Sequence, residues 1–215
     1  MDATVTVAAV EEVGPDTVSI TFESPAGFEA EPGQFLKLTG VVDGEEYSRF
    51  YTLSSPDVES TFETTVAIDP DEGGPFSEHL ASLSPGDELE IEGPFGSDYY
   101  EDEPRVVVLA GGPGIGPAVG IAERATADGN EVAIVYRDAT PAHRDRLDAL
   151  RERGATVHLL EDDAAELAPS VADVVTGADG EQVFVYGFAD FLEEATAALE
   201  AAGADRDAAK IENFG

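Results

Sequence analysis

The stretch RFYTLSSP, from Arg49 to Pro56, joins an arginine, a tyrosine and a run of hydroxyl side chains. Alternate side chains of a strand point to opposite faces, so one face would carry Arg49, Tyr51 and Leu53, and the other Phe50, Thr52 and Ser54. Neither face is apolar enough for a core, and neither is a clean polar face for water. The pattern leaves two interpretations: an irregular edge strand, or a strand with one face against a ligand.

A second stretch with chemical potential is AGGPGIGPA, from Ala110 to Ala118, which follows an apolar run and opens a helical pattern. Glycines let a backbone turn sharply and approach a ligand, and the free N–H groups of a helix start attract phosphate. From Gly112 the stretch reads G-x-G-x-G-P, whereas the usual dinucleotide fingerprint is G-x-G-x-x-G. Pro117 fits the first helical turn. Taken alone, a tight turn and a phosphate site explain these glycines equally well.

The end of the next apolar run bears on the choice of nucleotide. An acidic residue that holds a ribose 2′-OH is expected there, but the chain reads VYRDA, with Arg137 directly before Asp138. An arginine can pair with a 2′-phosphate, which favours NADPH over NADH. The alternative is that Arg137 pairs with a surface carboxylate.

The composition excludes several kinds of site. The 215 residues include no cysteine, which excludes disulfides, thiolate zinc sites and a cysteine-ligated iron–sulfur cluster. The three histidines (His79, His143 and His158) have no ligand-like spacing, which favours structural histidines over a metal site. No apolar run reaches the length of a membrane span. Met1 is followed by DATVTV, with no basic region or apolar block, so we expect no secretory signal and a soluble, cytoplasmic protein.

The charge balance is extreme, with 46 acidic and 11 basic residues and a net charge of −35. A disordered acidic protein is one interpretation, but alternating apolar residues and Gly/Pro turns argue against it. The other is a globular protein adapted to molar salt, in which a Debye length of about 3 Å screens the repulsion between carboxylates. We interpret the chain as a halophile's cytoplasmic enzyme. Such a surface disfavours binding to nucleic acid or to an anionic membrane.

Two halves of the chain follow different patterns. Up to about Gly96, short runs rich in Val, Thr, Ile and Phe alternate with turn sequences such as GPD, VDGEE and SPGD, and only FSEHLASL has helical spacing. This pattern predicts an antiparallel β-barrel, whose closure removes exposed edges. From Arg105 onward, apolar runs alternate with helical segments, except that the strand ATVHLLE is followed by the strand EQVFVYG with no helix between them. This pattern predicts a doubly wound parallel sheet. The boundary is expected between Ser97 and Pro104.

Several segments taken together resemble the ferredoxin–NADP reductase superfamily: PGQFLKL, RFYTLSS, GGPFSEHLASLSPGDELEIEGPFG, AGGPGIGP and a final KIENFG. The order and spacing of these segments carry the resemblance, which covers essentially the whole chain. It implies an FAD-binding antiparallel β-barrel domain over residues 1–100 and an NAD(P)-binding α/β domain over residues 104–215.

The resemblance also assigns roles on the flavin side. Arg49 would pair with the FAD pyrophosphate, Tyr51 would stack on the isoalloxazine, and Thr52 would place its hydroxyl near N5. Phe50 lies within the same cofactor-binding segment, and Leu53 and Ser54 would give backbone contacts beside the ring. A phosphate-facing segment at the start of the short helix would run from Gly74 to Ser77, with Gly73 as its companion.

On the nicotinamide side, the family's glycine loop would be formed by Gly111, Gly112, Pro113, Gly114, Ile115, Gly116 and Pro117. In IENFG, Phe214 would cover the flavin face where nicotinamide docks, and Glu212 would belong to the proton-handling cluster beside N5. One departure concerns the family's C-G-P-x-x-M, which here reads YGFADF: Tyr186 replaces the cysteine, Gly187 is kept, and Phe188 replaces the proline. Tyr186 would either narrow the nicotinamide pocket or stack on the nicotinamide.

The resemblance implies an FAD-dependent reductase that takes a hydride from NADPH or NADH and passes single electrons to a separate acceptor, for which a ferredoxin is the natural candidate. The alternative from the same fold is a flavin-containing electron-transfer module or subunit that does not turn over NAD(P)H efficiently. A third hypothesis is a nucleotide-binding regulatory protein without flavin, but the joint presence of Arg49, Tyr51 and Thr52 argues against it.

Overall fold

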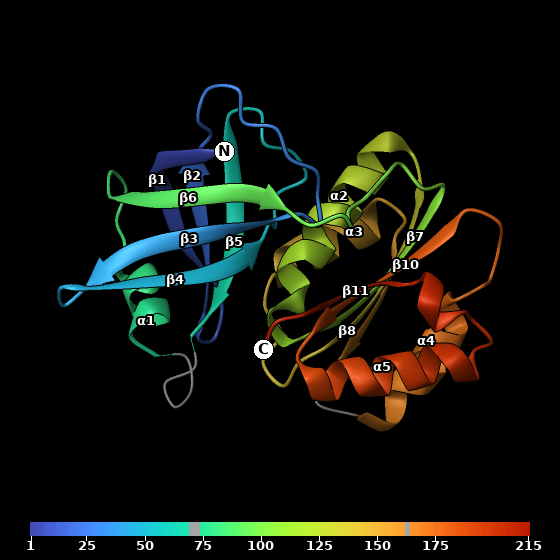
Figure 1. Ribbon diagram of the computed structural model, residues 1–215. Coiled ribbons are helices and arrows are strands. Elements are labelled where there is room, and N and C mark those ends of the chain that lie inside the picture. Colours follow the sequence, from blue (N-terminus) through green and yellow to red (C-terminus); the bar gives the residue numbers. More distant parts are fainter. Residues whose placement is uncertain (69–73, 162–163) are drawn as a thin grey trace.

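The computed structural model of the protein describes residues 1–68, 74–161 and 164–215. Within these residues, a strand-rich half and a half in which strands alternate with helices lie side by side (Figure 1). Each half has its own sheet, the first antiparallel and the second parallel. The predicted fold class is therefore confirmed.

The described part of the first half contains a six-stranded antiparallel sheet in the order β4-β3-β6-β1-β2-β5. Its strands are β1 (Asp2–Gly14), β2 (Thr17–Glu23), β3 (Phe35–Val42), β4 (Glu45–Thr52), β5 (Thr61–Ala67) and β6 (Glu88–Phe95). Burial alternates as the sequence predicts: in β6, Leu89 and Ile91 are buried, and the alternating Glu88, Glu90 and Glu92 are exposed. The inward side chains form one apolar core, against which α1 (Gly74–Ser82) packs Phe76 and Leu80.

The edge strands of this sheet, β4 and β5, approach each other but do not form a full ladder. One isolated bridge joins Leu53 to Thr64, and the Ser54 N–H donates to the Glu63 carbonyl at 2.8 Å. The sheet is thus barrel-like, with a seam between β4 and β5. Backbone groups at such a seam are free to meet a ligand, because no neighbouring strand covers them.

In the second half, the described residues contain a five-stranded parallel sheet in the order β11-β10-β7-β8-β9. Its strands are β7 (Arg105–Gly111), β8 (Glu131–Arg137), β9 (Thr156–Leu160), β10 (Glu181–Gly187) and β11 (Lys210–Asn213). The helices are α2 (Ile115–Asp128), α3 (Arg144–Glu152), α4 (Leu167–Val174) and α5 (Ala189–Ala201), and the short 3-10 turns are η1 (Gly112–Gly114), η2 (Ala164–Glu166) and η3 (Arg206–Ala208). Buried side chains of α2 and α3 cover one face, and those of α4 and α5 cover the other.

Helix α4 is missing from the sequence-based prediction, which passes from one strand directly to the next. Leu167, Val171 and Val174 have helical spacing and are buried. The proline at position 169 disguises this signal, because prolines more often interrupt helices. Here Pro169 lies in the first turn, where its backbone nitrogen has no partner to lose.

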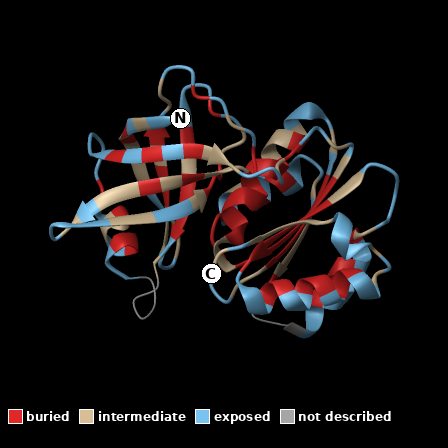
Figure 2. Cartoon of the chain, viewed as in Figure 1, coloured by how far each residue is buried: buried red, intermediate tan, exposed pale blue. Residues whose placement is uncertain are grey.

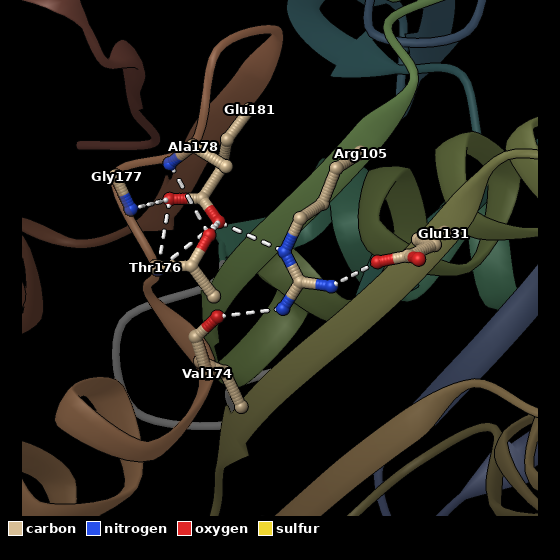
Figure 3. Close-up of polar contacts among 7 residues, drawn as sticks. All are labelled: Arg105, Glu131, Val174, Thr176, Gly177, Ala178 and Glu181. Carbon is tan, nitrogen blue, oxygen red and sulfur yellow. Dashed lines mark hydrogen bonds and ion pairs between the residues drawn. The ribbon is translucent and has the colours of Figure 1, made fainter.

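Figure 3 shows how Arg105 ties together the beginnings of three strands. Its guanidinium pairs with Glu181 at 2.8 Å and Glu131 at 2.7 Å and donates to the Val174 carbonyl at 2.8 Å. Burial alone would raise the pKa of Glu181, but hydrogen bonds from Thr176, Gly177 and Arg105 hold it below its usual value. This network fixes the sheet at the end opposite the glycine loop.

The two halves are joined by close packing and by charge. Figure 2 shows α2 largely buried beside the barrel. A Cβ at Gly116 would lie 2.8 Å from Thr65, and one at Gly120 would lie 3.0 Å from the Ser54 backbone, so glycine lets the helix approach the strands. Arg146 of α3 pairs with Glu63 at 2.7 Å and with Glu123 at 2.7 Å.

A buried histidine adds to this interface. His143 precedes α3. Its imidazole Nε2 lies 2.9 Å from the Thr65 hydroxyl, and its backbone N–H donates to the Val13 carbonyl at 2.8 Å. Burial, together with the neighbouring Arg146, lowers the pKa of His143 to about 4. The imidazole is therefore neutral at physiological pH and acts as a structural hydrogen-bonding group between the halves.

Candidate functional site

A cavity of about 340 Å³ lies where the seam of the barrel meets the second half. Among the residues that line it are eight singled out in the sequence: Arg49, Phe50, Tyr51, Thr52, Pro113, Pro117, Glu212 and Phe214. The cavity also takes in residues with no assigned role: Thr65, Ala67, Phe188, Asn213 and Gly215. Segments from the first half, the glycine loop and the end of β11 thus meet at one site.

A hydrogen bond spans this cavity between the two halves. The Thr52 hydroxyl donates to the Glu212 carboxylate at 2.9 Å, although the residues are 160 positions apart. Burial raises the pKa of Glu212 to about 7, and the nearby Asp98 adds to the rise, while the bond from Thr52 opposes it. A carboxyl group with this pKa can hold or release a proton near neutral pH, at the hydroxyl of Thr52.

Arg49 is exposed, and most N–H donors of its guanidinium have no partner among the described residues. Nine of the eleven Lys and Arg residues pair with a carboxylate within 4 Å, but Arg49 and Arg153 have no such partner among the described residues. In that part of the chain the Arg49 guanidinium donates only to the neighbouring Ser48 carbonyl, at 2.9 Å. In so acidic a chain, an unpaired guanidinium at a cavity is a ready partner for an anion.

Aromatic rings form the walls beside Arg49. Tyr51 is half-buried and packs against the barrel core, and burial raises the pKa of its phenol to about 12, so the ring is neutral. Phe50 is 62% exposed and lies edge-on to Phe35 at 5.6 Å and to Phe95 at 6.1 Å. These rings offer a planar ligand an apolar surface.

Other proposed flavin contacts lie outside the cavity lining. The N–H groups of Leu53 and Ser54, expected beside the ring, already have partners: Leu53 donates to the Gln34 carbonyl next to β3, and Ser54 donates to the Glu63 carbonyl across the seam. At the start of α1, the Ser77 hydroxyl donates to the Gly74 carbonyl at 3.1 Å. Gly73 lies outside the described residues.

Packing explains most of the glycine loop. At three of its glycines there is no room for a side chain. A Cβ would lie within 2.8 Å of Phe191 at Gly111, of Tyr186 at Gly114 and of Thr65 at Gly116. Ile115 is fully buried. Gly112 differs, because its φ of +55° lies in the left-handed region and a Cβ there would meet open space. Gly112 is therefore the loop position whose backbone can be approached by a ligand.

Arg137 is engaged by its own half of the chain. Its Nη1 donates to Glu194 at 2.6 Å, and its guanidinium lies 5.3 Å from the centre of the Phe191 ring. This is the alternative stated for Arg137, pairing with a surface carboxylate. The carbonyl of Gly187, at the end of β10, accepts from the Phe214 N–H at 3.1 Å, and a Cβ at Gly187 would lie 2.8 Å from Phe191.

Tyr186 is 1% exposed and does not line the cavity. Its ring lies 6.4 Å from Phe184 and 6.3 Å from Phe214, so it packs behind Phe214. Both roles expected for Tyr186, narrowing the pocket and stacking on nicotinamide, need its ring in the cavity, and the geometry does not provide this. Its hydroxyl points towards Gly33 and has no hydrogen-bond partner among the described residues. Burial holds the pKa of Tyr186 well above its usual value.

Sequence reasoning missed residues that complete the site. Thr65 lines the cavity and bonds His143, and Glu63 pairs with Arg146, yet both belong to an ordinary strand pattern with no motif. Phe188 carried a signal, because it replaces the proline of the resembled motif. Within the described residues, no cluster of His, Asp and Glu side chains could hold a metal ion. No helix in the same part of the chain is long and apolar enough to cross a membrane.

Comparison with known proteins adds the following. Residues 4–100 match the family described as "Oxidoreductase FAD-binding domain". A mouse protein named "NADH-cytochrome b5 reductase-like" is 36% identical over 134 residues, which cover 60% of this chain and 42% of the relative. A Methanopyrus kandleri protein named "Probable dihydroorotate dehydrogenase B (NAD(+)), electron transfer subunit" is 32% identical over 136 residues, which cover 63% of this chain and 49% of the relative. The matches span less than half the length of either relative.

Solved structures share the whole architecture. A ferredoxin NADP⁺ reductase from Neisseria gonorrhoeae with bound FAD and NADP has a TM-score of 0.82 at 20% identity, with 100% of this chain and 99% of that chain covered. A cytochrome P450 reductase from Amycolatopsis has a TM-score of 0.82 at 25% identity, with 100% of this chain and 70% of that chain covered. The two-domain ferredoxin reductase-like fold is therefore confirmed, and the family match confirms FAD as the expected cofactor of the first half.

The unpartnered hydroxyl of Tyr186 gives a prediction about stability. Removing a buried hydroxyl that bonds nothing relieves a desolvation cost, so Tyr186→Phe should leave the free energy of unfolding unchanged or raise it by about 1–3 kcal/mol. Tyr136 is the matched control, because it is equally buried but its hydroxyl bonds Asp138 and the Ala142 N–H, both at 3.1 Å. Denaturant unfolding should therefore show a loss for Tyr136→Phe, and an equal loss for both variants would contradict this account.

Proposed function

We propose that the protein is an FAD-dependent NAD(P)H oxidoreductase, whose reaction is hydride transfer from nicotinamide to flavin N5 followed by release of single electrons to a separate acceptor. The observation that carries the proposal is the cavity at the seam, where Arg49, Tyr51, Thr52, Glu212 and Phe214 meet. The FAD-binding family match over residues 4–100 supports it.

The residues around the cavity fit FAD. A pyrophosphate needs cationic or N–H donors, and Arg49 is the cation beside the cavity that has no carboxylate partner among the described residues. A flavin ring needs flat apolar walls, and Tyr51 and Phe214 line the same space. The proposed division follows from this, with residues 1–100 holding FAD and residues 104–215 holding the nicotinamide dinucleotide.

When bound, FAD supplies an acceptor for a hydride and can release the two electrons one at a time. The chain orients and protects it. Arg49 anchors the pyrophosphate, and Tyr51 and Phe214 shield the ring from water. The Thr52 hydroxyl donates to the Glu212 carboxylate at 2.9 Å, and the pKa of about 7 lets the Glu212 carboxyl take up or release its own proton near neutral pH. Gly112 offers backbone to the dinucleotide phosphates.

The proposed acceptor is a separate electron-carrier protein, with a ferredoxin as the first candidate. Among the relatives, a Pseudomonas aeruginosa protein is named "Glycine betaine monooxygenase reductase subunit" and is 39% identical over 104 residues, 46% of this chain and 28% of that protein. Such subunits serve a partner protein, which supports a separate acceptor here. The proposal includes both NADPH and NADH as hydride donors. Arg137, the residue that would favour the 2′-phosphate of NADPH, is already paired with Glu194.

A second candidate function is an electron-transfer subunit that turns over NAD(P)H poorly. Its support is the set of rings around Phe214: Phe188 lies edge-on to it at 6.5 Å and Tyr186 lies behind it at 6.3 Å. The relative from Methanopyrus kandleri that is named as an electron transfer subunit adds to that support.

The proposed working medium is molar salt. The support is the net charge of −35 together with the small number of cations, nearly all of them already paired. Raising KCl from about 0.1 M to about 1 M shortens the Debye length from about 10 Å to about 3 Å, which screens carboxylate repulsion. The midpoint of thermal unfolding should therefore rise steeply over this range, and a flat salt dependence would contradict the proposal.

The function is tested on protein purified in molar KCl. The visible spectrum should show bound flavin, and anaerobic addition of NADPH or NADH should bleach it. Arg49→Met should weaken FAD binding about 10- to 100-fold, because it removes a charge-assisted contact. Arg153→Met is the control, since Arg153 is likewise exposed and without an ion pair among the described residues.

Each outcome of this experiment is decisive. A colourless protein that takes up no added FAD would contradict both flavin functions. A yellow protein that neither nucleotide bleaches would favour the electron-transfer subunit over the oxidoreductase. Rapid bleaching would establish the hydride half-reaction, and the ratio of the two rates would give the nucleotide preference.

A further inference from the structure

Phe188 is one of the few large apolar side chains left exposed in the described part of the chain, at 51%. It immediately precedes α5 and lines the cavity. Its ring lies edge-on to that of Phe214, at 89° and 6.5 Å between centroids. A Cβ at Gly215 would lie 3.3 Å from the Phe188 ring, so the ring also lies beside the residue that follows Phe214.

On its other side, Phe214 contacts a ring that has little freedom to move. Tyr186 is 1% exposed and packs parallel to Phe184 at an interplanar angle of 8°. Its ring lies 6.3 Å from Phe214, tilted by 30°. Phe214 is held further by its N–H, which donates to the Gly187 carbonyl at 3.1 Å. The Phe214 ring is thus in contact with a fixed ring, Tyr186, and an exposed one, Phe188.

We propose that Phe188 is a gate residue, which holds the Phe214 ring in the cavity and so sets how readily nicotinamide reaches the flavin. The inference rests on the proposed function. Hydride transfer requires the reacting atoms to approach to about 3–3.5 Å, so two flat rings must lie face to face. Phe214 lines the cavity, and under the proposed function its ring covers the flavin face, so it must move before nicotinamide can stack there. Tyr186 blocks movement inwards, so displacement proceeds outwards and breaks the contact with Phe188.

A purely structural role for Phe188 makes different predictions. The side chain is half exposed and offers no hydrogen bond to the first turn of α5, so it contributes little to the fold. If it only covered the helix start, removing the ring would leave dinucleotide binding unchanged. If it gates, removing the ring lowers the cost of moving Phe214 and strengthens binding. Edge-to-face aromatic pairs are strong enough for an effect of about 2- to 10-fold.

The test uses the FAD-loaded full chain in molar KCl. NADP⁺ and NAD⁺ are titrated separately into the oxidised protein, and the perturbation of the flavin spectrum gives the Kd of each without any turnover. Phe188→Ala should lower the Kd about 2- to 10-fold and raise the rate of anaerobic flavin reduction by NADPH or NADH. Phe188→Tyr keeps an edge-on ring and should restore the wild-type Kd. Dithionite reduction serves as the reference, because it needs no stacked nicotinamide.

Val41→Ala is the matched control. Val41 is also a large exposed apolar side chain, at 61%, but it lies in β3 and does not line the cavity. Its substitution should change neither the Kd nor the reduction rate. Retained FAD content and an unchanged unfolding midpoint in all three variants show that the fold is intact.

The outcomes separate failure of the gate from failure of the proposed function. If wild-type protein is reduced by NADPH or NADH and Phe188→Ala binds dinucleotide no more tightly, the gate is wrong and the oxidoreductase stands. Weaker binding in Phe188→Ala also overturns the gate, since Phe188 would then support the dinucleotide. If neither protein binds or is reduced by either dinucleotide while both hold FAD, the gate and the hydride half-reaction fall together.

Discussion

The ion pairs of Arg146 are the constraint on which the site depends, because they hold the two halves of the chain in one arrangement. From α3, Arg146 reaches Glu63 of the barrel and Glu123 of α2, each at 2.7 Å, and donates to the Ser54 carbonyl at 2.7 Å. Ser54 and Glu63 also belong to the contact that closes the barrel. The cavity exists only while both halves keep these positions, so the same few residues shape the barrel and the site.

The chemistry of the site follows from where the barrel stays open. Between β4 and β5, one bridge replaces a full ladder, and the side chains of β4 face a cavity instead of a neighbouring strand. Among the described residues the Arg49 guanidinium bonds only the Ser48 carbonyl, in a chain of net charge −35. Thr52 of β4 meets Glu212 of β11, whose burial moves its pKa to about 7. The proposed anion site and the proposed proton site therefore line the same cavity.

Local patterns in the sequence were sufficient for the fold and for part of the site. Alternating burial predicts the strands of the barrel, and apolar runs predict the parallel sheet, while Pro169 conceals α4. RFYTLSS and IENFG predict residues that do line the cavity. Contacts between distant segments left no such trace: the bond of His143 with Thr65 and the burial of Tyr186 against Gly33 depend on how the halves meet. The glycine loop was ambiguous because packing against Phe191, Tyr186 and Thr65 selects glycine as strongly as a phosphate does.

The central claim is that the seam beside β4 is a flavin site anchored by Arg49. A crystal structure of the FAD-loaded protein, grown from molar salt, tests it most directly. The account predicts that the flavin ring lies in the cavity against Tyr51 and that the Arg49 guanidinium lies within hydrogen-bond distance of the pyrophosphate. FAD bound elsewhere on the molecule, or bound in the cavity with Arg49 turned away to solvent, would contradict it.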